Sequence, residues 1–439
     1  MKCSTLLNKA ITITFLLIVT ATGSAFSQIA DSLSLEEIID IVIKEHPSVN
    51  IAQEAVNNAK ARIGLARTGY NPEVDLSASY SYLGPVTKIS IPDMGSFQLF
   101  PENNYSAAIN YRQVIFDFGR TRQNIALEKE NMLIGEQALE QTRQKLSMLV
   151  VNNYFTLVYL QSAIRIKDEQ LKALNEHLNQ VLKMKETGSA TDYLVLSTKV
   201  KISAVEGQKV DLEAALEAQK ALLISLLGDK APASPVVKTG FSSDMPVVPA
   251  DSVLSYAFNN RDEVKLNEEK AALAALRYDL IKLQNKPLLS INASGGAKNG
   301  YLPYLGDPKV NYVVGLGLRV PIFDGMKNKY NLLQAKSAIE SVSHESELTK
   351  RTVTNELSEA RAYMAAAETK MRQFMLQMEQ AQKAYSLALT SFSSGVITNL
   401  DLLDANTAVS ESRLYFLKAR IDYAASIYKF RAALGERLY

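Results

Sequence analysis

The residues that could carry catalysis or hold a metal ion are few, and they do not group along the chain. His46, His177 and His344 are far apart, and none has a serine, cysteine or second ligand at a spacing that would build a nucleophile or a metal site. The Gly-Leu-Gly sequence at 315–317 begins like a phosphate-binding loop, but it lies in an alternating strand pattern without the glycine-rich turn that such loops need. We therefore expect a protein that is not an enzyme and that uses no cofactor and no metal ion.

Asp401 and Asp404 form the one pair whose spacing suggests a function based on charge. Because they are three residues apart near the start of a helical segment, their carboxylates share one face. Several such carboxylates around an opening would attract cations, repel anions and allow a bound cation to block passage. A local explanation is also open, because Thr398 is a good N-cap and acidic residues in a first turn favour the helix dipole.

The first residues have the order of a secretory signal peptide. Two lysines precede an apolar run at 10–22, which is too short to span a bilayer, and small residues follow it. We expect residues 1–27 to be removed by cleavage between Ser27 and Gln28. Cys3 precedes the apolar run, so we do not expect it to carry a lipid, and the mature chain would contain no cysteine.

Composition narrows the possible partners. The formal net charge of the 439 residues is +2, which argues against nucleic acid as a partner. After the first 27 residues no segment contains 18 consecutive apolar residues, so we expect no membrane-spanning helix.

The chain contains an internal duplication. A proline that opens an alternating segment recurs after 215 residues, and three later markers recur after 207 residues. The offset falls from 215 to 207 residues, which places eight extra residues between the two strands of the first copy. We expect a first repeat at 28–228, a proline-rich linker at 229–250 and a second repeat at 251–439. The paired markers are Pro72 and Pro287, Ile115–Asp117 and Ile322–Asp324, Gly188 and Gly395, and Leu227–Asp229 and Leu434–Glu436.

Each repeat contains a very long helix. Residues 326–394 contain neither proline nor glycine, and 120–187 contain only Gly135. Either stretch would be roughly 100 Å long as a helix. Apolar residues recur alternately every four and three residues, which predicts a left-handed coiled coil. Met371, Met375 and Met378 could bind a soft metal ion, but two of them occupy core positions of this pattern, which favours packing.

Each repeat also contains two segments that alternate between apolar and small polar residues. Alone, they fit either a soluble sandwich or a transmembrane barrel with tyrosines near its rims. Four strands cannot close a barrel, and open edges are excluded from lipid, so a barrel would need two, three or four copies with 8, 12 or 16 strands. The expected strands are 73–83, 105–115, 288–295 and 310–320, and Asn110, Arg112, Asn311 and Arg319 would face the barrel lumen.

These features resemble the TolC-like outer-membrane efflux proteins over essentially the whole mature chain. The resemblance rests on LSLEE at 33–37, PIFDG at 321–325, GVITNLDLLDA at 395–405 and AALGE at 432–436, together with the proline-led strands. It implies a mainly helical fold with a small β part: a homotrimer with a 12-stranded barrel in outer-membrane lipid, continued by a periplasmic α-helical barrel. It also implies docking to a periplasmic adaptor and an inner-membrane transporter.

On the family template we expect six helices, with the linker at 229–250 outside the helical barrel as an equatorial belt. Ser34 and Glu37 predict a capping box at the first helix. The expected helices are 34–70, 119–187, 191–227, 251–285, 325–394 and 398–434.

The resemblance also implies roles for the helix-to-helix turns. In each turn a glycine would end one helix and a threonine would cap the next. The family makes these turns the adaptor-docking tips, although ordinary turn chemistry also explains them. Asp401 and Asp404 match the acidic constriction of the family, whereas their equivalents in the first copy are Leu194 and Ser197. The docking residues would be Gly188, Ser189, Ala190, Thr191, Gly395, Val396, Ile397 and Thr398.

We therefore interpret the chain as the passive outer-membrane exit duct of a tripartite efflux or type I secretion system, gated at its periplasmic tip. Phe392 and Ile397 occupy positions where the family often has polar residues that latch the tip. The alternative is a periplasmic coiled-coil adaptor or scaffold that is not a channel. The sequence does not select among drugs, metals, peptides and proteins as cargo.

Overall fold

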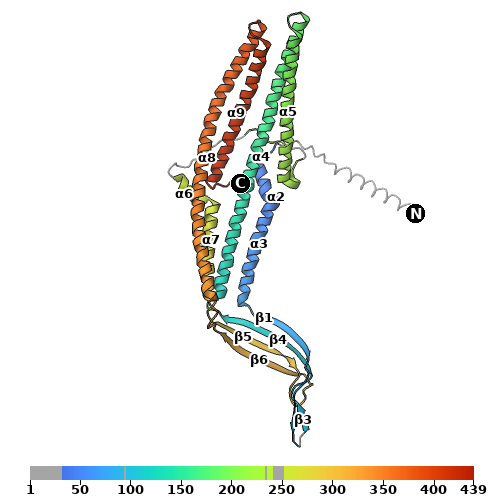
Figure 1. The fold of residues 1–439 in the computed structure, drawn as a ribbon, viewed down its shortest axis with the longest axis vertical. Coiled ribbons are helices and arrows are strands. Elements are labelled where there is room, and N and C mark those ends of the chain that lie inside the picture. Colours follow the sequence, from blue (N-terminus) through green and yellow to red (C-terminus); the bar gives the residue numbers. More distant parts are fainter. Residues whose placement is uncertain (1–31, 93–94, 233–234, 241–251) are drawn as a thin grey trace, which may run out of the picture.

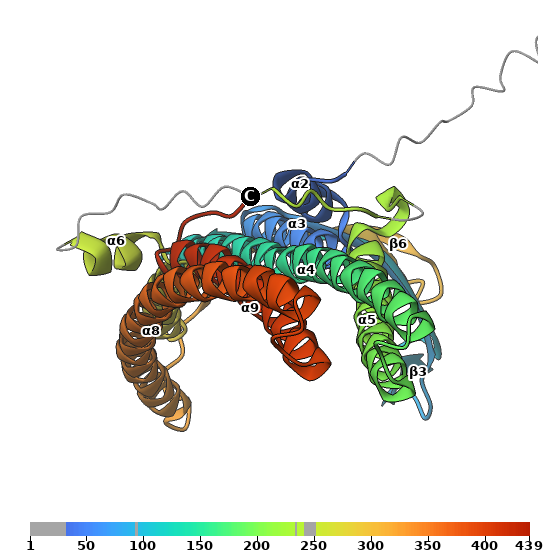
Figure 2. The ribbon, with the colours of Figure 1, turned by 90° about the horizontal axis from the view of Figure 1, so that it is seen from above.

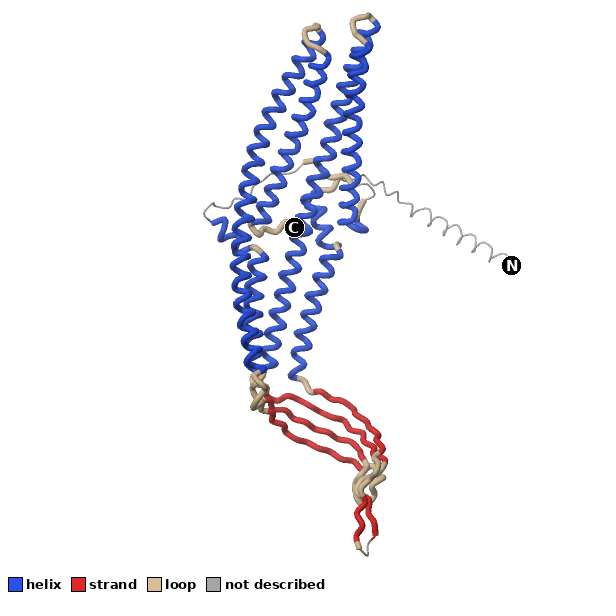
Figure 3. The backbone as a smooth tube through the Cα atoms, viewed as in Figure 1, coloured by secondary structure: helices blue, strands red, loops and turns tan. Residues whose placement is uncertain are grey.

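The computed structural model describes residues 32–92, 95–232, 235–240 and 252–439. The expected signal peptide at 1–27 lies outside these residues. The chain is elongated, with a β-sheet at one end and two helical hairpins at the other (Figure 1). Helices occupy the long part and strands are confined to the sheet end (Figure 3). We call the hairpin end the tip.

Two helices of equal length run between the sheet and the tip. Each has 67 residues, roughly 100 Å, as expected for segments without proline. Shorter helices pack beside them, one pair toward the tip and one pair toward the sheet. The long helices are α4 (Arg120–Glu186) and α8 (Lys327–Ser393), the tip pair is α5 (Asp192–Leu227) and α9 (Asn399–Ala433), and the sheet pair is α3 (Pro47–Arg67) and α7 (Asp262–Leu283).

The helices form one curved wall rather than a closed bundle. Toward the tip the packing order is α5, α4, α9, α8, and toward the sheet it is α3, α4, α7, α8. Seen along the long axis, the wall is an arc, with α2 (Leu35–Glu45) and the C-terminus on its convex side (Figure 2). Ser34 and Glu37 form the expected capping box at the start of α2.

Two helices that the sequence analysis predicted as continuous are each broken. The predicted helix 34–70 is α2, α3 and a short 3₁₀ turn, because His46 precedes Pro47 and takes the extended conformation that proline imposes on its neighbour. The predicted helix 251–285 is α6 (Val253–Asn260) and α7, separated at Arg261.

No proline explains the second break, and the cause is tertiary. The backbone of Gly435, with φ +81°, lies so close to Arg261 that a Cβ at Gly435 would be 2.7 Å from the Arg261 nitrogen. The guanidinium of Arg261 donates to Glu356 at 2.6 Å and to Glu263 at 2.9 Å. These contacts fix the chain between α6 and α7 against the end of α9.

The sheet contains four antiparallel strands in the order β1, β4, β5, β6. The two hairpins are joined edge to edge by β4 and β5, so β1 and β6 are the outer strands of the described sheet. The strands are β1 (Glu73–Tyr82), β4 (Asn103–Phe116), β5 (Leu288–Lys298) and β6 (Lys309–Arg319).

The segment between β1 and β4 contains a further small hairpin that the predicted strands did not include. Its strands are β2 (Lys88–Ile91) and β3 (Gly95–Gln98), and it projects beyond the sheet (Figure 1). Strands of four residues are too short for their alternation to be recognised in a sequence.

The largest apolar core lies on the convex side, where α2 packs against α4 and α5. Val237, from the linker, pairs with Leu33 and is 2 % exposed. The hydroxyl of Tyr154 donates to the carbonyl of Lys238 at 2.7 Å. This part of the linker is therefore fixed to the outside of the wall, while residues 241–251 lie outside the described residues.

Neighbouring glycines of β5 provide a test of the strand pairing between β4 and β5, which joins the two repeats. A Cβ at Gly296 would lie 2.0 Å from the Ala107 carbonyl oxygen on β4, whereas a Cβ at Gly295 would meet nothing within 4 Å. Gly296→Ala should lower the free energy of unfolding by about 3 kcal/mol or more, the upper end of the range typical of overpacking. It should also reduce the amount of assembled protein. Gly295→Ala is the matched control. Equal yields of heat-resistant oligomer from the two variants would contradict this packing.

Candidate functional site

The two tip turns have the same backbone geometry. Gly188 and Gly395 both have φ +76°, a left-handed conformation that glycine adopts without strain. The amide of Ser189 donates to the Met184 carbonyl at 2.7 Å, and the amide of Val396 donates to the Ser391 carbonyl at 2.9 Å. Each glycine thus ends its long helix in a Schellman-type turn. The predicted docking residues lie together at the tip, at the end of the molecule farthest from the sheet (Figure 1).

The two threonines that follow these turns differ in their capping contacts. Thr398 accepts from the amide of Asp401 at 3.2 Å, and its own amide donates to the Asp401 carboxylate at 2.8 Å, which completes a capping box. Thr191 occupies the N-cap of α5 but makes no side-chain capping bond. Hydrogen bonds from the Thr398 hydroxyl and backbone lower the pKa of Asp401 below its ordinary value. Asp401 is therefore ionised over the physiological range.

Asp404 lies one helical turn after Asp401 and is also exposed. Unlike Asp401, it has no hydrogen bond or ion pair within the described ranges. The capping explanation therefore accounts for Asp401 but not for Asp404. The structure brings the pair onto one exposed face at the start of α9, as their spacing predicts.

Phe392 and Ile397 lie in and beside an apolar cluster at the tip. Phe392 is 6 % exposed and packs in a cluster with Val181 of α4, Val195 of α5 and Leu402 of α9. Ile397 is half-buried against the same cluster. These residues therefore contribute packing at the positions where a polar latch was considered.

A buried polar group that the sequence analysis did not find lies next to this cluster. The Nε2 atom of His177 is 2.6 Å from the Oδ1 atom of Asn399, and Asn399 Nδ2 donates to Ser197 Oγ at 3.1 Å and to Thr198 Oγ1 at 3.4 Å. Burial lowers the pKa of His177, although the hydrogen bond with Asn399 opposes this effect. His177 is isolated in the sequence; its partner Asn399 comes from α9, and the hydroxyls to which Asn399 donates come from α5.

A second polar group lies farther along the interface of α4 and α9. Lys167 is 6 % exposed and donates to Gln170 at 3.2 Å and to Ser410 at 3.4 Å. Gln170 donates to Asn406 at 3.3 Å. Burial lowers the pKa of Lys167. Lys167 occupies a core position of the four-three apolar pattern of α4, and a lysine at such a position is the signal that the sequence offers.

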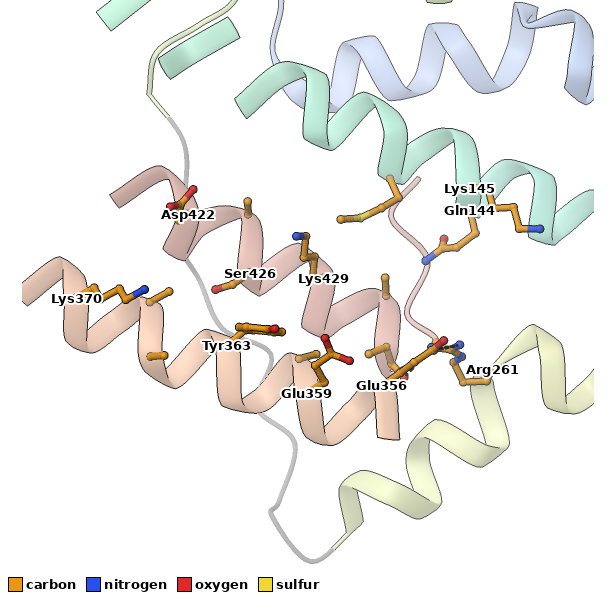
Figure 4. A pocket seen from close by; sticks show the side chains of 18 of the residues that line it. Gln144, Lys145, Arg261, Glu356, Glu359, Tyr363, Lys370, Asp422, Ser426 and Lys429 are labelled. Atoms are coloured by element: carbon orange, nitrogen blue, oxygen red, sulfur yellow. Dashed lines mark hydrogen bonds and ion pairs between the residues drawn. The ribbon is translucent and has the colours of Figure 1, made fainter. Parts of the chain in front are cut away.

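A cavity of about 920 Å³ lies where α9 ends beside α4 and α8 (Figure 4). Alanines of α8 and α9, including Ala367 and Ala433, form part of its lining, and Lys145, Lys370 and Lys429 lie around it. The ion pair of Arg261 with Glu356 closes one end. The cavity marks the level at which α7 replaces α9 in the wall.

The register of the sheet separates its two faces. Val74 pairs with Tyr111, Leu76 with Ile109, and Ile291 with Leu316, so apolar side chains share one face. The other face is polar: the Asn110 amide donates to Asp75 at 2.8 Å and to Ser77 at 3.0 Å. All four residues predicted to face the lumen, Asn110, Arg112, Asn311 and Arg319, lie on this polar face.

In the described part of the chain, none of the helices is both long and apolar enough to cross a membrane. Its histidines and acidic residues form no group of three or more that could hold a metal ion.

Equal long helices, a sheet with one polar and one apolar face, and paired tip hairpins define a class of duplicated strand-hairpin and long-helix proteins. The model of the outer membrane efflux protein family matches residues 38–229 and 259–436, and the chain belongs to that family. The resemblance inferred from the sequence motifs is confirmed, and so is the predicted fold class.

Curated relatives match along most of their length at low identity. The alkaline protease secretion protein AprF of Pseudomonas aeruginosa is 22% identical over 342 residues, which cover 76% of this chain and 70% of that protein. The outer membrane protein TolC of Salmonella enteritidis is 19% identical over 423 residues, which cover 94% of this chain and 84% of that protein.

Solved structures show the same fold. CusC has a TM-score of 0.78 at 18% identity, with 92% of each chain covered. The CmeC outer membrane channel of Campylobacter jejuni has a TM-score of 0.76 at 18% identity, covering 91% of this chain and 85% of that chain.

The two threonine caps give a matched pair of variants. Thr398→Ala removes the capping box and should destabilise the first turn of α9 by about 1 kcal/mol. Thr191→Ala removes no side-chain capping bond and should leave the first turn of α5 unchanged. Hydrogen exchange at the two helix starts measures both effects, and equal changes in exchange would contradict the assignment of the cap.

Proposed function

We propose that three copies of this chain assemble into the outer-membrane exit duct of a tripartite efflux or type I secretion system. The observation that carries the proposal is the four-stranded sheet, whose apolar and polar faces are separated and whose outer strands β1 and β6 each have one edge without a partner strand in the described chain. A strand edge cannot remain open in lipid, so β6 of one copy would pair with β1 of the next. Three copies supply twelve strands, in the range of known barrels.

The apolar face of the sheet would contact lipid. Leu76, Leu316 and Tyr312 are 76 %, 71 % and 82 % exposed in the single chain, which is expected of side chains that face hydrocarbon or its boundary. The polar face would line the lumen, with Asn110, Arg112, Asn311 and Arg319 among its residues. Amides and guanidinium groups there would keep the pore hydrated.

The duplication supports closure of the helical wall in the same way. Within the chain α4 packs against α7 and α9. Its counterpart α8 would pack against the counterparts α3 and α5 of the next copy. Apolar side chains on these surfaces are available for such contacts: Leu348 and Leu387 on α8, Leu196 and Val200 on α5, and Ile51 on α3 are each at least 60 % exposed.

The tip would contain the gate and the docking surface. Asp401 and Asp404 of three copies would place six carboxylates around the narrow end, where they would favour cations and could be blocked by them. The turns at 188–191 and 395–398 would contact a periplasmic adaptor, which in turn would contact an inner-membrane transporter. Relatives include a protease secretion protein and efflux pump proteins, so the class of cargo would depend on the transporter.

The remaining parts of the proposal follow from this role. The chain would reach the outer membrane after removal of a signal peptide near Ser27 and Gln28, without a lipid anchor, and would act as a passive channel rather than an enzyme. Energy for transport would come from the transporter.

The assembly is tested by fractionation. The full chain should enter the outer-membrane fraction, require detergent for extraction and crosslink as a trimer. Recovery as a monomer from the periplasm without detergent would contradict the duct and favour a coiled-coil adaptor or scaffold.

The gate is tested by conductance in planar bilayers. Asp401→Ala combined with Asp404→Ala should raise the conductance of the trimer or weaken its block by divalent cations, because the ring loses its charge. Asp192→Ala, which removes an exposed carboxylate from the other tip hairpin, is the control and should change neither property. Unchanged conductance and unchanged block in the double variant would exclude the ring as the constriction.

A further inference from the structure

The cavity between α4, α8 and α9 is opened by small side chains. Its volume of about 920 Å³ lies within the range of about 300–1,000 Å³ that is usual for sites of small molecules. Alanines line it from both α8 and α9, at positions where larger side chains would fill the space between packed helices. These alanines are Ala360, Ala366 and Ala367 on α8 and Ala419, Ala425 and Ala433 on α9.

The first repeat shows that the wall does not need this space. At the positions 207 residues earlier, large apolar residues replace two of the alanines, and apolar residues replace two of the lysines around the cavity. The corresponding residues are Leu160 for Ala367, Leu226 for Ala433, Ala163 for Lys370 and Leu222 for Lys429. Helix packing in a duplicated wall therefore explains neither the alanines nor the lysines of the second repeat.

Aromatic rings give the cavity flat apolar surfaces. Phe374 on α8 and Tyr415 on α9 both line it, and their stacked rings have centroids 5.5 Å apart at an interplanar angle of 29°. Tyr363 is 64 % exposed and lies over the space between α8 and α9 (Figure 4). Exposed ring faces in a concave site are suited to a flat apolar molecule.

The charges around the cavity are not balanced. Most of the carboxylates that line it already have cationic partners: Glu263 and Glu356 pair with Arg261, Asp262 with Arg437, and Asp422 with Lys418. Within the described residues, Lys145, Lys370 and Lys429 have no hydrogen bond or ion pair, and Glu359 is the one lining carboxylate without a partner. Three ammonium groups, one each from α4, α8 and α9, thus exceed the single free carboxylate, and the cavity favours an anion.

Two relations along α9 place the cavity on the concave side of the wall. Asp422 in the lining and Ala424 in the convex-side core are two residues apart, so they lie on opposite sides of the helix. Tyr415, Asp422 and Lys429 follow Asp401 by 14, 21 and 28 residues, so in helices packed with a seven-residue repeat they share its face. In the proposed duct this face borders the lumen.

We propose that this cavity is a binding site for organic anions with a flat apolar body, on the lumen side of the duct. The lysines contact the anionic group, and the aromatic rings and alanines contact the body. Three copies of the chain supply three such sites at one level of the wall. This inference rests on the proposed function, because the cavity borders a lumen only in the assembled duct.

Binding is tested with two probes that share one ring system and have opposite charges. Naphthalenesulfonate and naphthyltrimethylammonium are titrated by calorimetry into detergent-solubilised trimers of the full chain. We expect one sulfonate per chain, bound at least about tenfold more tightly than the cation, because ammonium groups form charge-assisted hydrogen bonds with the sulfonate. Equal affinities for the two probes, or no saturable binding of the sulfonate, would overturn the inference.

The contribution of charge is tested by two double variants. Lys370→Ala with Lys429→Ala should weaken sulfonate binding at least about tenfold. Lys350→Ala with Lys383→Ala removes the same charge from exposed positions of α8 outside the lining, and should weaken binding less than about twofold because these charges are screened by solvent. All four side chains are exposed, so neither variant disturbs the core. Equal weakening by the two variants would show that the sulfonate does not bind in this cavity.

The contribution of shape is tested by Ala367→Leu, which introduces the residue of the first repeat and fills part of the cavity. It should weaken sulfonate binding at least about tenfold, whereas Ala365→Leu, at an exposed position outside the lining, should change it less than about twofold. In planar bilayers the sulfonate should lower the conductance of the parent trimer and of Ala365→Leu but not that of Ala367→Leu. Equal effects on Ala365→Leu and Ala367→Leu would overturn the inference.

Failure of this inference and failure of the proposed function have different results. Trimers that conduct ions but do not bind the sulfonate would overturn the binding site and leave the duct in place. A chain that binds the sulfonate but forms no conducting trimers would contradict the duct, and with it the position of the site in a lumen.

Discussion

Backbone hydrogen bonding at the two outer strands is the constraint on which the rest of the structure depends. A sheet with one apolar face can enter lipid only if each amide and carbonyl is paired, and one chain pairs only the inner strands and the inward edges of β1 and β6. In the proposed duct, further copies would therefore supply the missing partner strands. The helical wall would then close with the same symmetry as the sheet, because both are parts of one chain.

The duplication makes this closure geometrically simple. Both long helices have 67 residues, so the two halves of the wall end at the same height above the sheet. Contacts inside the chain, such as those of α4 with α7 and α9, show how equivalent surfaces would meet between chains. The two kinds of joint would be related but not identical, because the positions 207 residues from His177 and Asn399 are Ala384 and Asp192.

Sequence patterns predicted the parts of the fold that depend on local repetition. The long helices, the four main strands and the glycine turns follow from proline spacing, heptads and alternation, and the structure has them. The break at His46 could have been inferred from Pro47, whereas the break at Arg261 depends on contacts with Gly435 that are distant in sequence. The same limit applies to His177, whose partners Asn399 and Phe392 come from α9 and α8. The roles of Asp401, Asp404 and the lumen residues stay predictions, because their function depends on copies that surround a common axis.

The short helices end midway along the wall, whereas the long helices are continuous there. Toward the middle of the wall α9 ends against the start of α7, while α4 and α8 pass this level without a break. The break between α9 and α7 is therefore flanked by two continuous helices, α4 and α8. A bending force applied at one end would be transmitted past this level by α4 and α8. The wall can therefore be stiff along its length, although each short helix packs over only part of that length.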